Sequence, residues 1–106
     1  VNLAADVNNA LWWAVINGQA KVAEILLKDK RVDPTVDDNF MIKCAAQNGY
    51  TEIVEMLLKD KRVNPAVDGN YAIRYAKEYG HVEVVELLLK DKRVDPAAKN
   101  KPIIMQ

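Results

Sequence analysis

The sequence predicts a single all-α domain, a solenoid of helix-turn-helix repeats joined by short irregular loops. The first observation is an internal repeat: the segment Lys-Asp-Lys-Arg-Val occurs three times, at residues 28–32, 59–63 and 90–94. The second is that glycine recurs with the same 31-residue spacing, at Gly18, Gly49 and Gly80. Self-similarity at a fixed period of this length is typical of repeat architectures, in which each repeat is one supersecondary unit.

The repeat divides the chain of 106 residues into three units within one domain. The units are residues 1–31, 32–62 and 63–93, followed by a partial unit or C-terminal stub at 94–106. The length is that of one small domain, so no second domain is expected.

Two short helices are expected in each unit, and unit three illustrates the pattern. The first helix is predicted over 71–79, with Asn70 as its N-cap because the asparagine side chain can accept a bond from an unpaired N–H. Gly80 ends this helix, since glycine tolerates the left-handed conformation found there. A broad apolar stripe predicts the second helix over 82–90.

Helices this short are marginal alone in water, so the units must stack to bury their apolar faces. Equivalent positions are expected to line up along the core, in rows made of Leu11, Ile42 and Ile73, of Val22, Ile53 and Val84, and of the leucines of the second helices. Unit two is covered on both sides, so its residues are expected to form the central core, namely Ile42, Ala45, Ile53, Val54 and Leu57.

Composition argues against catalysis and against most ligands. The chain has no serine, one histidine and one cysteine, and fifteen basic residues balance fifteen acidic ones. One cysteine and one histidine do not make a zinc site, and Cys44 is expected to be buried and unreactive. The longest apolar run, 10–16, is far below the ~20 residues that cross a bilayer. We therefore expect no enzyme, no metal or cofactor, no membrane span and no small-molecule substrate.

The second half of each unit resembles the ankyrin repeat. The run Gly80-His81-Val82-Glu83-Val84-Val85-Glu86-Leu87-Leu88-Leu89 is an almost complete match to that family's second helix, and the run 49–58 matches well. The first half departs from the family, because Tyr71-Ala72-Ile73-Arg74 stands where Thr-Pro-Leu-His is usual. The resemblance implies a non-catalytic protein-binding module, a structural hydrogen bond at His81, and a shortened irregular loop in place of the usual β-hairpin.

The first helix of unit one carries an unusual apolar patch. Trp12 corresponds to Lys43 and Arg74 in the later units, and Ile16 corresponds to Gln47 and Glu78. These positions lie one helical turn apart, on the face that is concave in ankyrin repeats. An exposed tryptophan beside an isoleucine fits an interface anchor. The sequence therefore predicts a partner-binding site made of Asn9, Trp12, Trp13, Ile16, Lys43, Gln47, Arg74 and Glu78.

The Lys-Asp-Lys-Arg blocks allow another interpretation. Stacked, they form a ladder of basic residues that could attract phosphate or an acidic partner. Neighbouring acidic residues dilute this charge, and nucleic-acid binding is not expected because the net charge is zero. A solvated edge is the simpler explanation of the ladder, because lysine and arginine also favour the C-terminal end of a helix dipole.

The partner is expected to be another protein or a second copy of this chain in a homodimer. A structural spacer segment of a longer array, with no dedicated partner, is the alternative. The missing initiator methionine and the abrupt apolar patch fit an excised piece or an engineered ankyrin-like scaffold. Localisation cannot be read from the sequence, and the cytoplasm is expected if the protein is natural.

Overall fold

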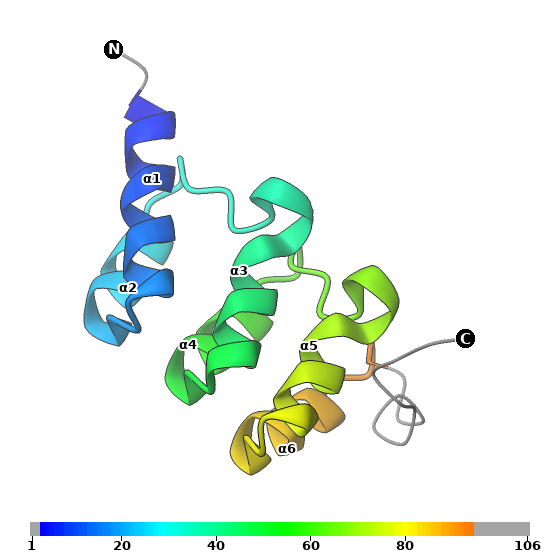
Figure 1. Ribbon diagram of the computed structural model, residues 1–106. Coiled ribbons are helices and arrows are strands. Elements are labelled where there is room, and N and C mark those ends of the chain that lie inside the picture. The colour runs from blue at the N-terminus through cyan, green and yellow to red at the C-terminus, as the bar shows by residue number, and fades with distance from the viewer. Residues whose placement is uncertain (1–2, 95–106) are drawn as a thin grey trace.

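The computed structural model describes residues 3–94, and within this range it contains six helices and no strand (Figure 1). The all-α prediction is therefore confirmed. The helices are α1 (Leu3–Ile16), α2 (Ala20–Leu27), α3 (Val36–Asn48), α4 (Thr51–Leu58), α5 (Val67–Glu78) and α6 (Val82–Lys90). The predicted stub at 94–106 lies, apart from Val94, outside the described residues. No helix in the described range is long and apolar enough to cross a membrane.

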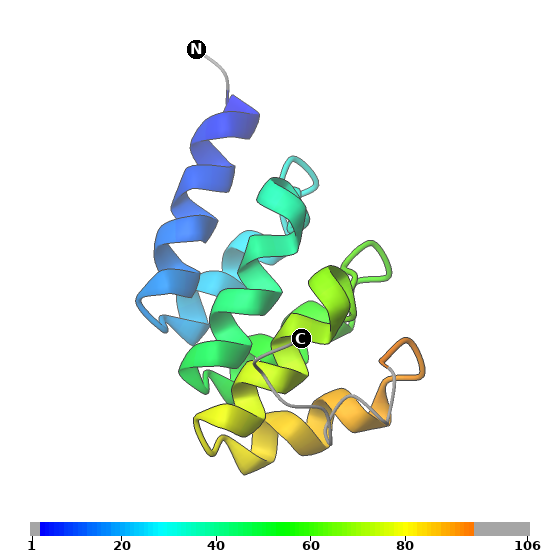
Figure 2. The same cartoon turned by 45° about the vertical axis from the view of Figure 1, so that its right-hand side comes forward.

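The helices are arranged in two layers. Helices α1, α3 and α5 pack side by side, and α2, α4 and α6 form the second layer behind them (Figures 1 and 2). Each first-layer helix also packs against the helix that follows it in the chain. The stack measures 45 × 23 × 22 Å along its principal axes, as expected for units that contact only their neighbours.

The predicted core is confirmed at its centre. All five residues expected to be buried in unit two are buried, as are Leu11 and Ile73 in the neighbouring units. The prediction that Val22 lies in the core with Ile53 and Val84 is wrong. Val22 is 40% exposed, whereas the other two side chains are buried. Val22 lies in α2, and in the described part of the chain α4 is the only second-layer helix packed beside α2. Within this part the apolar stripe of α2 is therefore covered by a neighbouring unit on one side.

The first helix of unit three begins with an irregular turn. Its bounds are Val67–Glu78, but Asp68, Gly69 and Asn70 inside it have left-handed backbone angles, which separate a short first turn from the rest. Regular right-handed helix therefore begins after Asn70, where the sequence predicts it, and the capping bond of Asn70 stays a prediction. The same left-handed turn occurs at Asp37–Asn39 in α3. Asparagine, aspartate and glycine are the residues that adopt this conformation at least cost.

Asparagines at the repeated position hold the next loop. The Asn8 side-chain oxygen accepts a hydrogen bond from the Asp33 N–H at 2.7 Å, and the Asn39 oxygen accepts one from the Asn64 N–H at 2.9 Å. Each bond satisfies a loop N–H that the helices leave unpaired. The recurring asparagine thus joins successive units, which is why the sequence repeats it.

Side-chain bonds from the residues just before α4 and α6 join the units at the opposite end. The Tyr50 hydroxyl donates to the carbonyl oxygen of Ile16 at 3.1 Å, and His81 Nε2 donates to the carbonyl oxygen of Gln47 at 3.0 Å. Tyr50 and His81 are equivalent residues, as are Ile16 and Gln47. The structural hydrogen bond expected at His81 is therefore confirmed.

Candidate functional site

All eight residues predicted to bind a partner lie on the first-layer helices α1, α3 and α5. Trp12 is 43% exposed and Trp13 is 55% exposed, although both are large apolar side chains. Asn9 and Glu78 are exposed as well, and the other members are half-buried, namely Ile16, Lys43, Gln47 and Arg74. We call the exposed side of these three helices the first-layer face.

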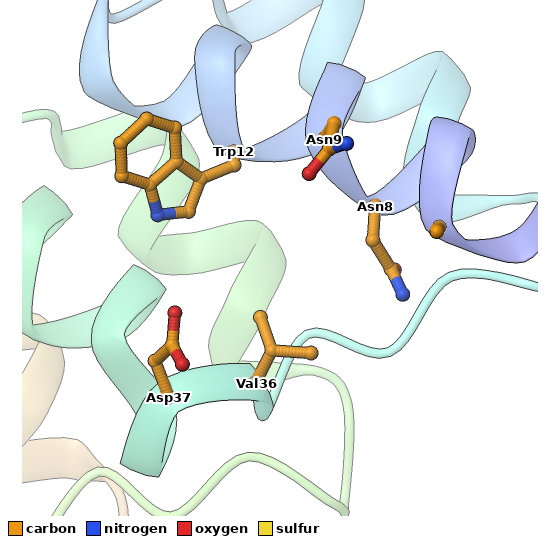
Figure 3. Close-up of a pocket in the computed structure, with 6 residues that line it drawn as sticks. Asn8, Asn9, Trp12, Val36 and Asp37 are labelled. Carbon is orange, nitrogen blue, oxygen red and sulfur yellow. The ribbon is translucent and has the colours of Figure 1, made fainter.

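Trp12 stands at the edge of an open hollow between α1 and α3. The hollow has a volume of about 380 Å³, and Figure 3 shows the side chains around it. Its lining residues are Ala5, Asn8, Asn9, Trp12, Val36 and Asp37. An indole, a carboxylate and two amides therefore face the same space, which offers apolar, ionic and hydrogen-bonding contacts to a ligand.

The Trp12 ring packs on Phe40. The two ring centroids are 5.7 Å apart with an interplanar angle of 25°, which is a stacked pair. The Lys43 ammonium lies over a different ring, 5.5 Å from the centroid of Tyr71.

Lys43 is held by unit three. Its ammonium pairs with the Asp68 carboxylate at 2.6 Å, and its side chain is only 16% exposed. The Tyr71 hydroxyl donates to the side-chain oxygen of Gln47, which fixes both groups. Burial raises the pKa of the Tyr71 phenol above its usual value, with neighbouring Tyr75 contributing in the same direction.

Arg74 is similarly engaged within the chain. Its guanidinium donates to the carbonyl oxygens of Gly69 and Asp68, at 2.9 and 3.1 Å, and lies over the ring of Tyr75. The cations of Lys43 and Arg74 therefore stabilise the first-layer face itself.

Sequence reasoning missed a set of aromatic residues on the same face. Tyr71 and Tyr75 lie in α5 and Tyr79 is its C-cap, and successive ring centroids are 4.3 and 6.3 Å apart. Their four-residue spacing was a readable signal, because residues four apart share one face of a helix. With Trp12 and Phe40 they give the first-layer face the aromatic composition common at protein interfaces.

Cys44 is less buried than predicted. It is half-buried and lines a shallow groove on the first-layer face together with Lys43, Gln47 and Tyr71. The Asn48 side-chain amide contacts its sulfur at 3.6 Å. Burial raises the pKa of the Cys44 thiol, which disfavours the reactive thiolate. Among the described residues there is no group of three His, Cys, Asp or Glu side chains that could hold a metal ion.

The arginines of the basic ladder are used inside the fold. Arg31, Arg62 and Arg93 each pair with the aspartate two residues earlier, at 2.6, 2.8 and 2.7 Å. Two of them also donate to backbone carbonyl oxygens: Arg62 to that of Val32 at the start of its own unit, and Arg93 to that of Val63 in its own unit. Arg93 also donates to the carbonyl oxygens of Leu58 and Lys61 in the preceding unit. The lysines of the ladder stay exposed.

Comparison with known proteins agrees with this architecture. The family model described as ankyrin repeats in three copies matches residues 11–100. No curated protein and no solved structure gives a significant match. Ankyrin repeats are generally protein–protein interaction modules, and the family is typically non-enzymatic. With a match over most of its length and the helix pairs to support it, the chain belongs to the ankyrin repeat family.

Proposed function

We propose that this chain is a non-catalytic protein-binding module and that its partner docks on the first-layer face around Trp12. The observation that carries the proposal is the exposure of Trp12 beside the hollow. At 43% exposure, a residue type that usually packs inside is left open to solvent. The polar residues at the equivalent positions, Lys43 and Arg74, are engaged within the chain.

The anchor is energetically suited to this role. A tryptophan buries about 150–250 Å² in a full contact, and stacking on Phe40 covers only part of its ring. The contact with Phe40 also restricts the indole, so little side-chain entropy remains to be lost on binding. Asn9, Trp13 and Ile16 extend the anchor along α1, while Gln47 and Glu78 continue the surface onto α3 and α5.

The three units are proposed to act as one binding domain, with boundaries at 1–31, 32–62 and 63–93. Bonds from Tyr50, His81 and Arg93 to the preceding unit hold the units in a fixed relation. A rigid array presents its first-layer face without an ordering cost at the moment of binding.

A displayed library of random peptides, panned on the whole chain, tests the proposal. Recovered peptides are compared on the parent, on Trp12→Arg and on Ile25→Glu. Ile25 is the control because it is 68% exposed on α2, in the other layer. Binding lost in Trp12→Arg and kept in Ile25→Glu supports the proposal. Peptides that bind all three chains equally, or a selection that yields none, contradict it.

Self-association through the same face is a variant of this proposal, and sedimentation velocity separates it from binding to a different protein. If the parent forms a dimer that Trp12→Arg disperses, the partner is a second copy. A monomeric parent excludes self-association and leaves a different protein as the proposed partner.

A further inference from the structure

The hollow beside Trp12 has a counterpart in the next unit, and in that counterpart the space holds a cation. Trp12 and Asp37 are equivalent to Lys43 and Asp68, each displaced by one repeat. Between units two and three the Lys43 ammonium pairs with the Asp68 carboxylate at 2.6 Å. Between units one and two the lysine is replaced by tryptophan, and no basic side chain is among the described residues that line the hollow.

The two carboxylates are presented in the same way. Asp37 has φ 54° and ψ 51°, and Asp68 has φ 54° and ψ 50°. In Figure 3 the carboxylate of Asp37 points from α3 towards the indole of Trp12. No ion pair or hydrogen bond to its side chain is formed by the described residues, and it is exposed. The backbone thus places a carboxylate at the same position in units two and three, but only Asp68 has a basic partner, Lys43.

The aromatic surroundings are also matched. In the filled counterpart the Lys43 ammonium lies 5.5 Å from the centroid of Tyr71. Phe40 is the residue equivalent to Tyr71, and it stacks on Trp12. A cation placed near Asp37 would therefore meet aromatic faces as well as a negative charge, and tryptophan is the aromatic side chain that attracts cations best.

We propose that the hollow between Trp12 and Asp37 receives a basic side chain, lysine or arginine, from the partner protein. The partner supplies the cation that Lys43 supplies one unit later, and Asn9 offers its amide oxygen to the same group. This inference rests on the proposed function and names the chemistry of the partner. The partner surface is expected to present at least one basic residue next to an apolar contact for the indole.

Two small probes test the inference on the whole chain, Nα-acetyl-lysine N-methylamide and its norleucine analogue, which lacks the amino group. The indole N–H signal of Trp12 and the side-chain amide of Asn9 are followed by NMR during titration. The expected result is saturable binding of the lysine probe, about three- to tenfold tighter than the norleucine probe. Equal binding of the two probes, or no binding of the lysine probe, overturns the inference.

Matched variants locate the effect. Asp37→Asn is expected to weaken the lysine probe by about two- to fivefold, whereas Asp38→Asn leaves it unchanged. Asp38 is the control because it is the next residue, exposed and in the same backbone conformation. Equal weakening in both variants would show a non-specific charge effect and contradict the inference.

A third variant fills the hollow from inside. Trp12→Lys recreates the Lys43–Asp68 arrangement, so its ammonium is expected to pair with Asp37 and to exclude the lysine probe. The Asn9 amide reports binding in this variant, and undiminished binding there overturns the inference. If library peptides require Trp12 but bind Asp37→Asn as tightly as the parent, this inference is overturned and the proposed function stands. The absence of any ligand that depends on Trp12 would instead overturn the proposed function.

Discussion

The imidazole of His81 occupies the space that a side chain at Gly49 would need. A Cβ atom at Gly49 would lie 2.5 Å from His81 Nδ1, too close for the ring to stay in place. The same ring donates through Nε2 to the carbonyl oxygen of Gln47. Gly18 has the same relation to Tyr50, with a Cβ atom at 2.9 Å from the ring. The glycine of one unit thus makes room for the bond that joins it to the next.

Replacement of Gly49 by alanine is expected to destabilise the protein more than replacement of Gly80. Both glycines have positive φ, 74° and 75°, so both substitutions incur backbone strain of about 1 kcal/mol or more. Nothing lies within 4 Å of a Cβ atom at Gly80 among the described residues. Gly49→Ala must also displace His81 and break its bond to Gln47, an additional cost of about 1 kcal/mol. Urea denaturation of the two variants measures the difference, and equal free energies of unfolding would contradict the account.

The central core makes Ile53 a sensitive position. Ile53→Ala is expected to lower the free energy of unfolding by about 2–5 kcal/mol, because a fully buried side chain is lost and a cavity remains. Val22→Ala is the control, since Val22 is the equivalent residue of unit one and is 40% exposed. Its cost is expected to stay below about 1 kcal/mol. Similar losses in thermal denaturation of both variants would disprove the stacking register.

Arg93 is expected to stabilise the stack where Arg31 does not. Both pair with an aspartate two residues earlier, but Arg93 also donates to the carbonyl oxygens of Leu58 and Lys61 in the preceding unit. Arg93→Lys loses the planar fork that makes these bonds, at a cost of about 1–2 kcal/mol. Arg31→Lys is expected to be nearly neutral. Chemical denaturation compares them, and a neutral Arg93→Lys would refute the bridging role.

Low pH is expected to lower the free energy of unfolding, because it protonates the aspartates that pair with arginines in the same loops. Each aspartate of these loops accepts hydrogen bonds from the arginine two residues later. These bonds lower the pKa of Asp29 to about 2, and they lower the pKa values of Asp60 and Asp91 below the ordinary 3.8. A pKa that is lower in the folded state stabilises folding above the unfolded value, and the gain is lost as pH falls through the folded value. The urea concentration at the midpoint of unfolding should therefore decrease as the pH is lowered below about 4. Asp91→Asn removes one of these carboxylates, so the urea midpoint of this variant should decrease less over the same pH range. A pH profile that the substitution leaves unchanged would argue against the pairing.

The repeat period explains how much of the fold was predictable. Identical spacing of Gly18, Gly49 and Gly80 marks the helix ends, and the apolar spacing of α6 marks its bounds, so these local features follow from one unit alone. The exposure of Val22 does not, because it depends on which neighbours a terminal helix has. The left-handed angles at Asp68–Asn70 do not follow either, because an asparagine before a helix predicts an N-cap and not a left-handed turn.

The candidate site was predictable only in part. Comparison of equivalent positions singles out Trp12, because its apolar ring replaces a cation. The same comparison could not show that Lys43 pairs with Asp68, since that contact joins two units through a non-regular turn. Nor could it show the Trp12–Phe40 stack, which depends on the distance between α1 and α3. Contacts between units need the relative placement of helices, which one-dimensional spacing does not contain.

The role of Trp12 as the anchor is tested most directly by calorimetry. The dissociation constant of a selected protein or peptide ligand is measured with the parent, Trp12→Arg and Ile25→Glu, alongside the free energy of unfolding of each chain. The account predicts that Trp12→Arg weakens binding by about 30-fold or more, as for an interface hot spot worth about 2 kcal/mol. It predicts that Ile25→Glu changes affinity by less than about twofold, and that Trp12→Arg loses no more than about 1.5 kcal/mol of stability with the Phe40 stack. Unchanged affinity in Trp12→Arg, or unfolding of that variant, would contradict the claim that Trp12 is a surface anchor for a partner.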